Sequence, residues 1–141
     1  MKTKRFLVDT SALIRLGRND ELRRSWRREI DSGLLGVCSS TELELFFSAR
    51  SAADRKAIQS ELNKTFTWVV TPEKVFERAH EIQKALHSRG THRSAGPVDL
   101  LVSATAQLQG LALLHYDRDF DTVASTTGQD VPWVAEPGSV D

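Results

Sequence analysis

The sequence has one cysteine, no formal net charge and no long apolar segment, and each of these features argues against a class of protein. The single cysteine, Cys38, cannot form an internal disulfide or belong to a cysteine-rich metal site, and its position beside Val37 favours a buried thiol. The apolar run at 6–8 is too short to span a membrane or to serve as a signal peptide, so we expect a cytoplasmic protein without membrane contact. The 19 basic and 19 acidic residues cancel, which argues mildly against a tight, non-specific binder of nucleic acid.

The pattern of apolar residues predicts strands that alternate with helices along a single domain, residues 1–141. The chain is long enough to bury a core of its own, and no repeat or linker divides it. Strands are expected at 5–8, 34–38, 67–70, 111–115 and 131–134, the last at a sheet edge because it contains Pro132. Such alternation indicates an α/β fold with a central parallel sheet and helices on both faces, in which ligands bind at the carboxyl ends of the strands.

Capping residues predict where several of the intervening helices begin. Ser39 and Glu42 match the S-x-x-E capping box at the start of one helix, and Thr71 with Pro72 marks the start of a long helix that runs to about Ser88. Further helices are expected at 10–16, from 20 to about 30, at 53–64 and at 97–109. The segments at 87–96 and 117–121 are expected to be loops.

Four acidic residues fall near the sheet edge at which ligands are expected. Asp9 and Asp117 follow predicted strands, while Glu44 and Asp99 lie near the starts of helices. Each taken alone is also explained as a helix cap, a favourable charge on a helix dipole or a solvated residue. Converging carboxylates repel one another unless a cation lies among them, and oxygen ligands without a cysteine cluster favour Mg²⁺ or Mn²⁺. Such a site is suited to phosphodiester hydrolysis.

At most one of the glutamates at 42 and 44 can face this site. Residues two apart on a helix point roughly 200° away from each other. Glu42 is assigned to the capping box, and Glu44 has apolar neighbours on both sides, Leu43 and Leu45, that leave little of the helix for solvent. Glu44 is therefore the preferred member of the acidic set.

Segments of the chain, taken in order, resemble the motifs of PIN-domain ribonucleases, and specifically of the VapC toxins of bacterial VapBC toxin–antitoxin pairs. The segments are 8–13, 44–45, 99–104 and 115–120. The resemblance implies a three-layer α/β/α sandwich, an Mg²⁺- or Mn²⁺-dependent endoribonuclease with one or two metal ions, a homodimer, and inhibition by a cognate VapB-like antitoxin. It also implies a catalytic and metal-binding set, followed by accessory positions: Asp9, Glu44, Asp99 and Asp117, then Thr10, Ser11 and Asp119.

The surface also offers candidates for contacts with RNA and with partner proteins. The basic loop that contains Arg89 and Arg93 leads directly into the helix of Asp99, so contacts to RNA phosphates are expected there. The arginine cluster around Trp26 is more simply a solvated helix face. Apolar residues on the early helices could serve a second copy of the chain or the antitoxin, and the sequence does not separate these two uses.

Other functions are compatible with parts of the pattern. A haloacid-dehalogenase-like phosphatase requires a second aspartate two positions after the first, where this chain has Ser11. A receiver domain requires an aspartate after the third strand, where this chain has Val70-Thr71, and a late lysine that is absent. A non-catalytic RNA- or antitoxin-binding module of the same fold is the remaining alternative, and the intact acidic set argues against it.

Overall fold

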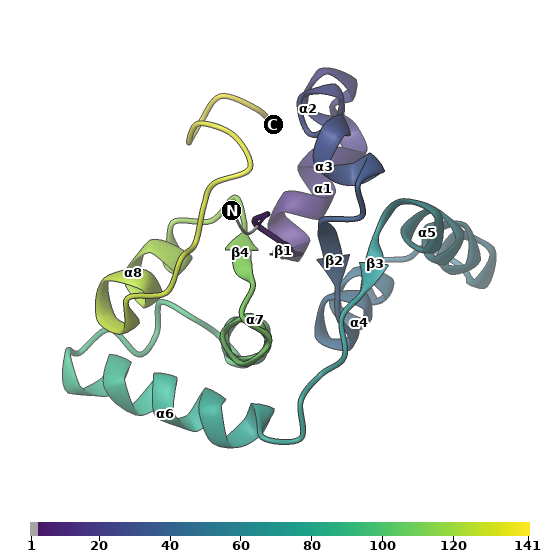
Figure 1. Ribbon diagram of the computed structural model, residues 1–141. Helices are drawn as coiled ribbons and strands as arrows, with labels where there is room; N and C mark the ends of the chain where they lie inside the picture. Colours follow the sequence, from purple (N-terminus) through teal and green to yellow (C-terminus); the bar gives the residue numbers. More distant parts are fainter. Residues whose placement is uncertain (1–2) are drawn as a thin grey trace.

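The computed structural model describes residues 3–141, so the first two residues of the expected domain lie outside the described residues. The elements follow the order β1 (Phe6–Val8), α1 (Thr10–Arg18), α2 (Asp20–Ser25), α3 (Arg27–Asp31), β2 (Leu35–Val37), α4 (Ser39–Phe47), α5 (Ala52–Thr65), β3 (Thr67–Trp68), α6 (Val75–Ser88), α7 (Pro97–Gln109), β4 (Ala112–Leu114) and α8 (Asp119–Thr127). The strands form a parallel sheet in the order β3-β2-β1-β4 (Figure 1). The predicted α/β fold with a central parallel sheet is confirmed.

The two faces of this sheet are both buried, because successive side chains of a strand point to opposite faces. Phe6 and Val8 of β1 pack in one cluster with apolar residues of α1, α2 and α5. Leu7, between them, packs in a second cluster with Val102 of α7 and Phe120 of α8. Figure 1 shows α1, α2 and α3 on one side of the sheet and α6 and α7 on the other, which is the expected three-layer arrangement.

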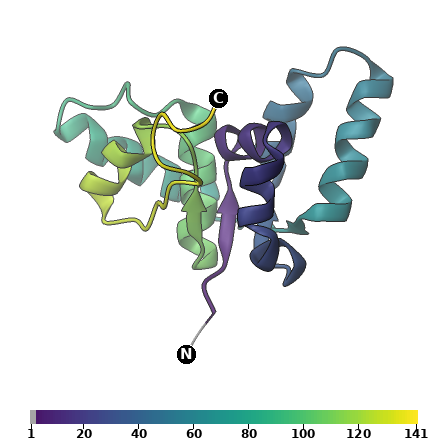
Figure 2. The same ribbon diagram turned by 90° about the horizontal axis from the view of Figure 1, so that it is seen from above.

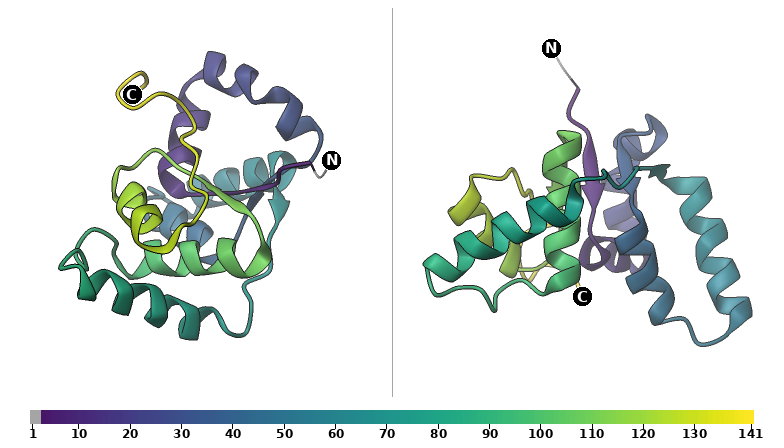
Figure 3. Two further views of the ribbon diagram at one scale, coloured as in Figure 1. Left: turned by 60° about the vertical axis from the view of Figure 1, so that its left-hand side comes forward. Right: turned by 90° about the horizontal axis from the view of Figure 1, so that it is seen from below.

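Helix α6 lies along α7 and forms the outermost part of one layer (Figure 3). Its buried residues recur at the spacing of one helix face and form a third core cluster with Leu100 and Ala104 of α7: Val75, Ala79, Ile82 and Leu86. Helix α5 projects on the opposite side of the molecule (Figure 2), and Leu62 is its buried residue. Within residues 3–141, no helix has the length and apolarity needed to cross a bilayer.

The predicted capping box at Ser39 and Glu42 is wrong. Cys38 occupies the N-cap position of α4, Ser39 is already helical, and no side-chain capping hydrogen bond forms there within the described chain. Cys38 is instead fully buried, as predicted, with its Sγ 3.6 Å from the Thr41 hydroxyl. The demands of core packing at the end of β2 therefore override the local capping signal.

The predicted start of the long helix at Thr71 and Pro72 is also wrong by several residues. Helix α6 begins at Val75, whose side chain is buried in the core cluster with α7, and the Val75 amide donates to the Pro72 carbonyl at 3.1 Å. Residues 71–74 are used to cross from the sheet to the outer layer, so the helix starts where its apolar face meets α7.

Tertiary contacts also change the expected elements at other places. The helix predicted from 20 to 30 is divided at Trp26, whose indole N–H donates to the Val134 carbonyl at 2.9 Å. The fifth strand predicted at 131–134 is reduced to one parallel bridge between His115 and Trp133. The acidic segment predicted to be a loop instead leads into helix α8, which begins at Asp119. Gly128, in the left-handed conformation, is the C-cap of this helix.

Candidate active site

The carboxyl ends of β1 and β4 lie side by side and place their following residues at one edge of the sheet. Asp9 follows β1, and its backbone amide donates to the carbonyl of Leu114, the last residue of β4, at 2.9 Å. Asp117 lies three residues beyond Leu114. Two acidic residues from opposite ends of the sequence are thus brought to the same edge by parallel pairing.

Asp9 has two carboxylate oxygens in different environments. Its Oδ2 caps helix α1 by accepting the Ser11 amide at 3.0 Å and the Ser11 hydroxyl at 2.6 Å. Its Oδ1 is buried and finds no hydrogen-bond partner among residues 3–141, although the side chain as a whole is only 3% exposed. Burial raises the pKa of Asp9, the Ser11 hydrogen bonds oppose this shift, and the charge of Glu44 adds to it. The helix-cap explanation therefore accounts for one oxygen and leaves the other open to a ligand.

Ser11 connects Asp9 to the loop that follows β4. Its hydroxyl donates to Asp9 and accepts the backbone N–H of Tyr116 at 2.9 Å, so it joins the loop after β4 to the first acid. The neighbouring Thr10 is buried, and its Oγ1 has no partner in the described chain. Of the two hydroxyls, that of Ser11 is already engaged, and that of Thr10 remains available.

Asp99 occupies the first turn of α7, where the helix dipole favours an anion. Its Oδ2 accepts the Gly96 amide at 3.1 Å. Burial raises the pKa of Asp99 to about 6; the Gly96 hydrogen bond opposes the shift, whereas the charges of Asp9, Glu44 and Asp117 increase it. The charges of the other three predicted acids therefore all act on Asp99.

The two glutamates of α4 have different electrostatic neighbours. The charge of Glu44 raises the pKa of both Asp9 and Asp99. Burial raises the pKa of Glu42, and the nearby charge of Arg55 on α5 lowers it. The capping argument for Glu44 was wrong. The preference for Glu44 over Glu42 stays a prediction, and the effect of the Glu44 charge on Asp9 and Asp99 favours it.

Asp117 and Asp119 lie at the start of α8. The Oδ1 of Asp117 accepts the Asp119 amide at 2.9 Å, so Asp117 supports the first turn of that helix. Burial, together with the charge of Asp117, raises the pKa of the exposed Asp119. Asp119 thus lies beside the acidic group at its solvent edge.

Sequence reasoning assigned no role to Arg15, and it predicted for His115 only packing at the end of a strand beside the site. The guanidinium of Arg15 lies 4.8 Å from the centre of the Tyr116 ring, and its Nη1 donates to the Ser11 carbonyl at 3.2 Å. The spacing of four residues between Ser11 and Arg15 on a helix was the available signal. His115 is fully buried, and its Nδ1 accepts a hydrogen bond from the Asp117 amide.

The acidic group fits a divalent cation by its chemistry. Among residues 3–141 the buried Oδ1 of Asp9 lacks a partner, and a bound cation would relieve the repulsion that three other acids exert on Asp99. In the part of the chain that the structure describes, no three acidic, histidine or cysteine side chains converge closely enough to enclose an ion by themselves. Mg²⁺ commonly keeps several water ligands and uses one or two carboxylates, so a more open acidic site suits it.

The basic residues predicted to contact RNA lie between α6 and α7. Arg89 directly follows α6, is exposed, and donates to the Ser125 carbonyl of α8 at 3.1 Å. Arg93 is exposed in the loop that leads to Gly96 and α7. This loop therefore presents positive charge on the approach to the helix of Asp99.

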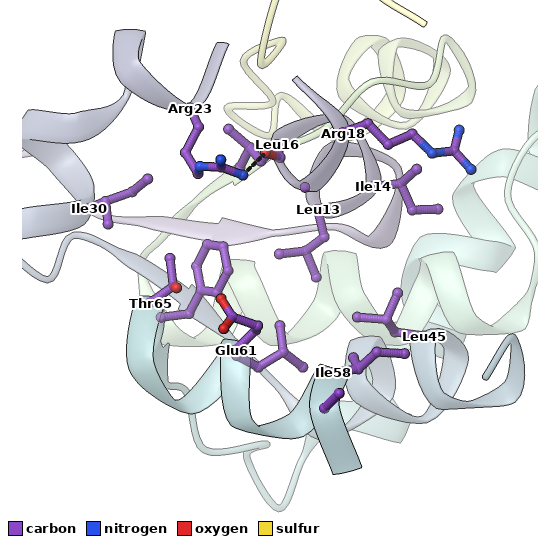
Figure 4. Close-up of a pocket in the computed structure, with 14 residues that line it drawn as sticks. Leu13, Ile14, Leu16, Arg18, Arg23, Ile30, Leu45, Ile58, Glu61 and Thr65 are labelled. Atoms are coloured by element: carbon purple, nitrogen blue, oxygen red, sulfur yellow. Dashed lines mark hydrogen bonds between the residues drawn. The ribbon is translucent and has the colours of Figure 1, made fainter. Parts of the chain in front are cut away.

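An apolar groove of about 560 Å³ lies between α1, α4 and α5 (Figure 4). Its apolar lining includes Leu13, Ile14, Leu45, Ile58, Leu62 and Phe66. Arg18, Arg23 and Glu61 also line it. Asp9 caps α1 and Glu44 lies on α4, so two helices of the groove are linked to an acid of the set, although none of the four acids lines the groove itself.

The fold and the acidic group at the carboxyl ends of β1 and β4 define a class of protein, namely α/β proteins with a carboxylate site at the ends of parallel strands. The PIN domain family model matches residues 6–125. Ribonuclease VapC21 of Mycobacterium tuberculosis is 39% identical over 137 residues, which cover 97% of this chain and 99% of the relative. Ribonuclease VapC2 of the same organism is 40% identical over 131 residues, 92% of each chain.

A solved structure of the same fold is DNA-bound VapBC from Salmonella typhimurium. Its matching chain superposes with a TM-score of 0.78 at 18% identity and covers 94% of this chain and 100% of that chain. The chain belongs to the PIN-domain family, among the members named ribonuclease VapC. The resemblance recognised from four sequence segments is confirmed.

Proposed function

We propose that this chain is a divalent-metal-dependent endoribonuclease that acts as the toxin of a toxin–antitoxin pair. Its relatives are named ribonucleases, and the reaction class is hydrolysis of RNA phosphodiester bonds. The observation that supports the site assignment is the buried Oδ1 of Asp9, which has no partner among residues 3–141, together with the charges of Asp9, Glu44 and Asp117 that act on Asp99. Action in the cytoplasm and assembly as a homodimer belong to the same proposal.

Asp9, Glu44, Asp99 and Asp117 would hold Mg²⁺ or Mn²⁺, with water completing the coordination. When bound, such an ion lowers the pKa of an attacking water and neutralises negative charge on the phosphate. Asp99, with its pKa raised to about 6, has to give up its proton before it can serve as a ligand.

The remaining residues orient the acids and the substrate. Ser11 holds the Asp9 carboxylate in place through its hydroxyl. Asp119 acts as an accessory acid at the solvent edge, and the Thr10 hydroxyl is available to a bound water or phosphate. Arg89 and Arg93 attract the RNA backbone, so binding weakens as salt concentration rises.

The groove between α1, α4 and α5 is the proposed site of the antitoxin. VapBC and toxin–antitoxin complexes are among the solved structures that share this fold. An apolar segment of an antitoxin would cover the exposed lining, and acidic residues on it would complement Arg18 and Arg23. Leu45, which lines the groove, directly follows Glu44 on α4, so a partner seated there would contact a helix that carries one of the acids.

Purified, antitoxin-free protein tests the catalytic part of this proposal. RNA is incubated with the wild type, Asp9→Asn and Asp31→Asn in Mg²⁺, in Mn²⁺ and in EDTA. Asp31 is an exposed residue of α3 in a surface pair with Arg27, so its substitution is a matched control that changes little else.

We expect internal cleavage of RNA by the wild type and by Asp31→Asn in either metal, and none in EDTA. Asp9→Asn should cleave only at background level. Undiminished cleavage by Asp9→Asn would remove the metal-site assignment. RNA binding by the wild type without cleavage in either metal would favour the non-catalytic module instead.

A further inference from the structure

His115 is a fully buried polar residue that the proposed chemistry does not use. It follows β4 directly and makes a parallel bridge with Trp133 of the C-terminal segment. Its ring lies 5.1 Å from the Phe120 ring of α8 and 4.8 Å from the Trp133 ring, measured between centroids. Its backbone is also fixed, because its carbonyl accepts the Val134 amide at 2.8 Å. The imidazole is thus confined by the sheet, α8 and the C-terminal segment together.

Both ring nitrogens of His115 are engaged, and their partners determine the tautomer. Nδ1 lies 3.0 Å from the backbone nitrogen of Asp117, which can only donate, so Nδ1 accepts. Nε2 lies 3.0 Å from the carbonyl oxygen of Val131, which can only accept, so Nε2 carries the proton and donates. The ring therefore links the C-terminal segment to the backbone of a proposed metal ligand.

The orientation of Asp117 depends on this link. Its amide is bound to His115, and its Oδ1 accepts the Asp119 amide at 2.9 Å, so both ends of the residue are restrained. Groups that orient a metal ligand change metal affinity even though they do not touch the ion. Fixing the backbone of Asp117 limits the directions in which its second carboxylate oxygen can point.

We propose that His115 is a positioning residue, whose Nδ1 holds the Asp117 backbone so that its carboxylate is directed towards Asp9 and Asp99. This inference rests on the proposed function, since it assigns metal binding to Asp117. In it, the C-terminal segment 131–134 is a part of the active-site scaffold, although it contributes no acid to the site.

Two substitutions separate the two hydrogen bonds of the ring. In His115→Asn, Oδ1 occupies nearly the position of Nδ1 and can accept the Asp117 amide, but the bond to Val131 is lost. In His115→Gln, the longer side chain can place a donor near the Val131 carbonyl, but the acceptor for Asp117 is lost. Both variants remove the imidazole, so they share the loss of aromatic packing against Phe120 and Trp133.

Mn²⁺ binding, measured by calorimetry or electron paramagnetic resonance without RNA, is the readout for these variants. We expect His115→Gln to weaken Mn²⁺ binding by roughly 10-fold and His115→Asn by less than about threefold. Urea unfolding checks that both variants are folded. A pure packing role predicts equal losses in Mn²⁺ affinity, and equal losses or unchanged affinity in both variants would overturn the inference.

The wild-type protein offers a test that needs neither a variant nor a metal. An N–H···N hydrogen bond transmits a scalar coupling between its two nitrogens, and a chain of 15.8 kDa is suited to such a measurement. We expect a ¹⁵N–¹⁵N coupling between the Asp117 amide and Nδ1 of His115, with the ring protonated at Nε2. Absence of this coupling would overturn the inference and leave the nuclease proposal standing, whereas a wild type that binds no Mn²⁺ would overturn both.

Discussion

Replacing Asp99 with asparagine is expected to stabilise the metal-free protein at neutral pH while it removes the nuclease activity. The carboxylate is half-buried among three other acids, and in the absence of a cation its charge opposes folding. Asparagine has nearly the same shape, and its Oδ1 can still accept the Gly96 amide. The substitution therefore removes the charge with little change in packing.

The magnitude follows from the shift in pKa. Folding raises the pKa of Asp99 from 3.8 to about 6, which corresponds to about 3 kcal/mol if fully realised. Solvent screens a half-buried group, so we expect a gain of about 1–2 kcal/mol. For a chain of this size that gain raises the Tm by about 3–8 °C.

The size of this stabilisation depends on pH. Because the pKa of Asp99 is higher in the folded state than in the unfolded state, the folded protein holds the proton more tightly. The destabilisation by the ionised carboxylate is complete above about pH 6 and fades as the pH falls towards 4. The advantage of the asparagine variant should shrink over the same range.

Thermal and urea unfolding of the wild type, Asp99→Asn and the control Asp31→Asn in EDTA at pH 7.5 and at pH 4.5 provide the assay. Saturating Mn²⁺ should reverse the order at pH 7.5, since a ligand at 100 times its Kd adds about 2.7 kcal/mol to a protein that binds it. A destabilised Asp99→Asn at pH 7.5 in EDTA, or an advantage that persists unchanged at pH 4.5, would refute the reasoning.

Three further substitutions test other parts of the structure. Ser11→Ala should cost about 1–2 kcal/mol in urea unfolding and weaken Mn²⁺ binding, because the first acid loses its hydroxyl donor; unchanged stability and affinity would contradict this. Gly36→Ala should cost about 1–3 kcal/mol, because its Cβ would lie 2.5 Å from Cγ2 of Val69, and a stability equal to the wild type would contradict this close approach. Ile58→Glu should weaken antitoxin binding at least about 10-fold and leave RNA cleavage unchanged, whereas Ser60→Glu on the exposed face of the same helix should do neither.

The first four strands and their parallel pairing were predictable, because short runs such as 6–8 and 112–114 are apolar throughout, as strands buried on both faces must be. Local signals failed where tertiary contacts competed with them. Trp26 interrupts a helix-forming segment to reach Val134, and Val75 sets the start of α6 by packing against α7. Helix α8 was missed because Asp119 and Asp121 were interpreted as a turn, although acids in a first turn and a following Gly128 are also helix signals.

The candidate acids of the site were also predictable from the sequence, since the carboxyl ends of strands and the starts of the following helices lie at one edge of a parallel sheet. The sequence did not predict which hydrogen bonds each carboxylate makes. The Ser11 hydroxyl that donates to Asp9 also accepts the amide of Tyr116, which lies 105 positions away in the sequence. No local pattern encodes such contacts.

The sequence by itself determined the class of fold, the family and the identity of the candidate acids, because alternation, strand ends and ordered motifs are properties of neighbouring residues. The tertiary structure decided the effect of the Glu44 charge on Asp9 and Asp99, the pKa of Asp99 and the link from His115 to Asp117. These depend on burial and on distances between side chains from different elements, and both come into existence only when the chain has folded.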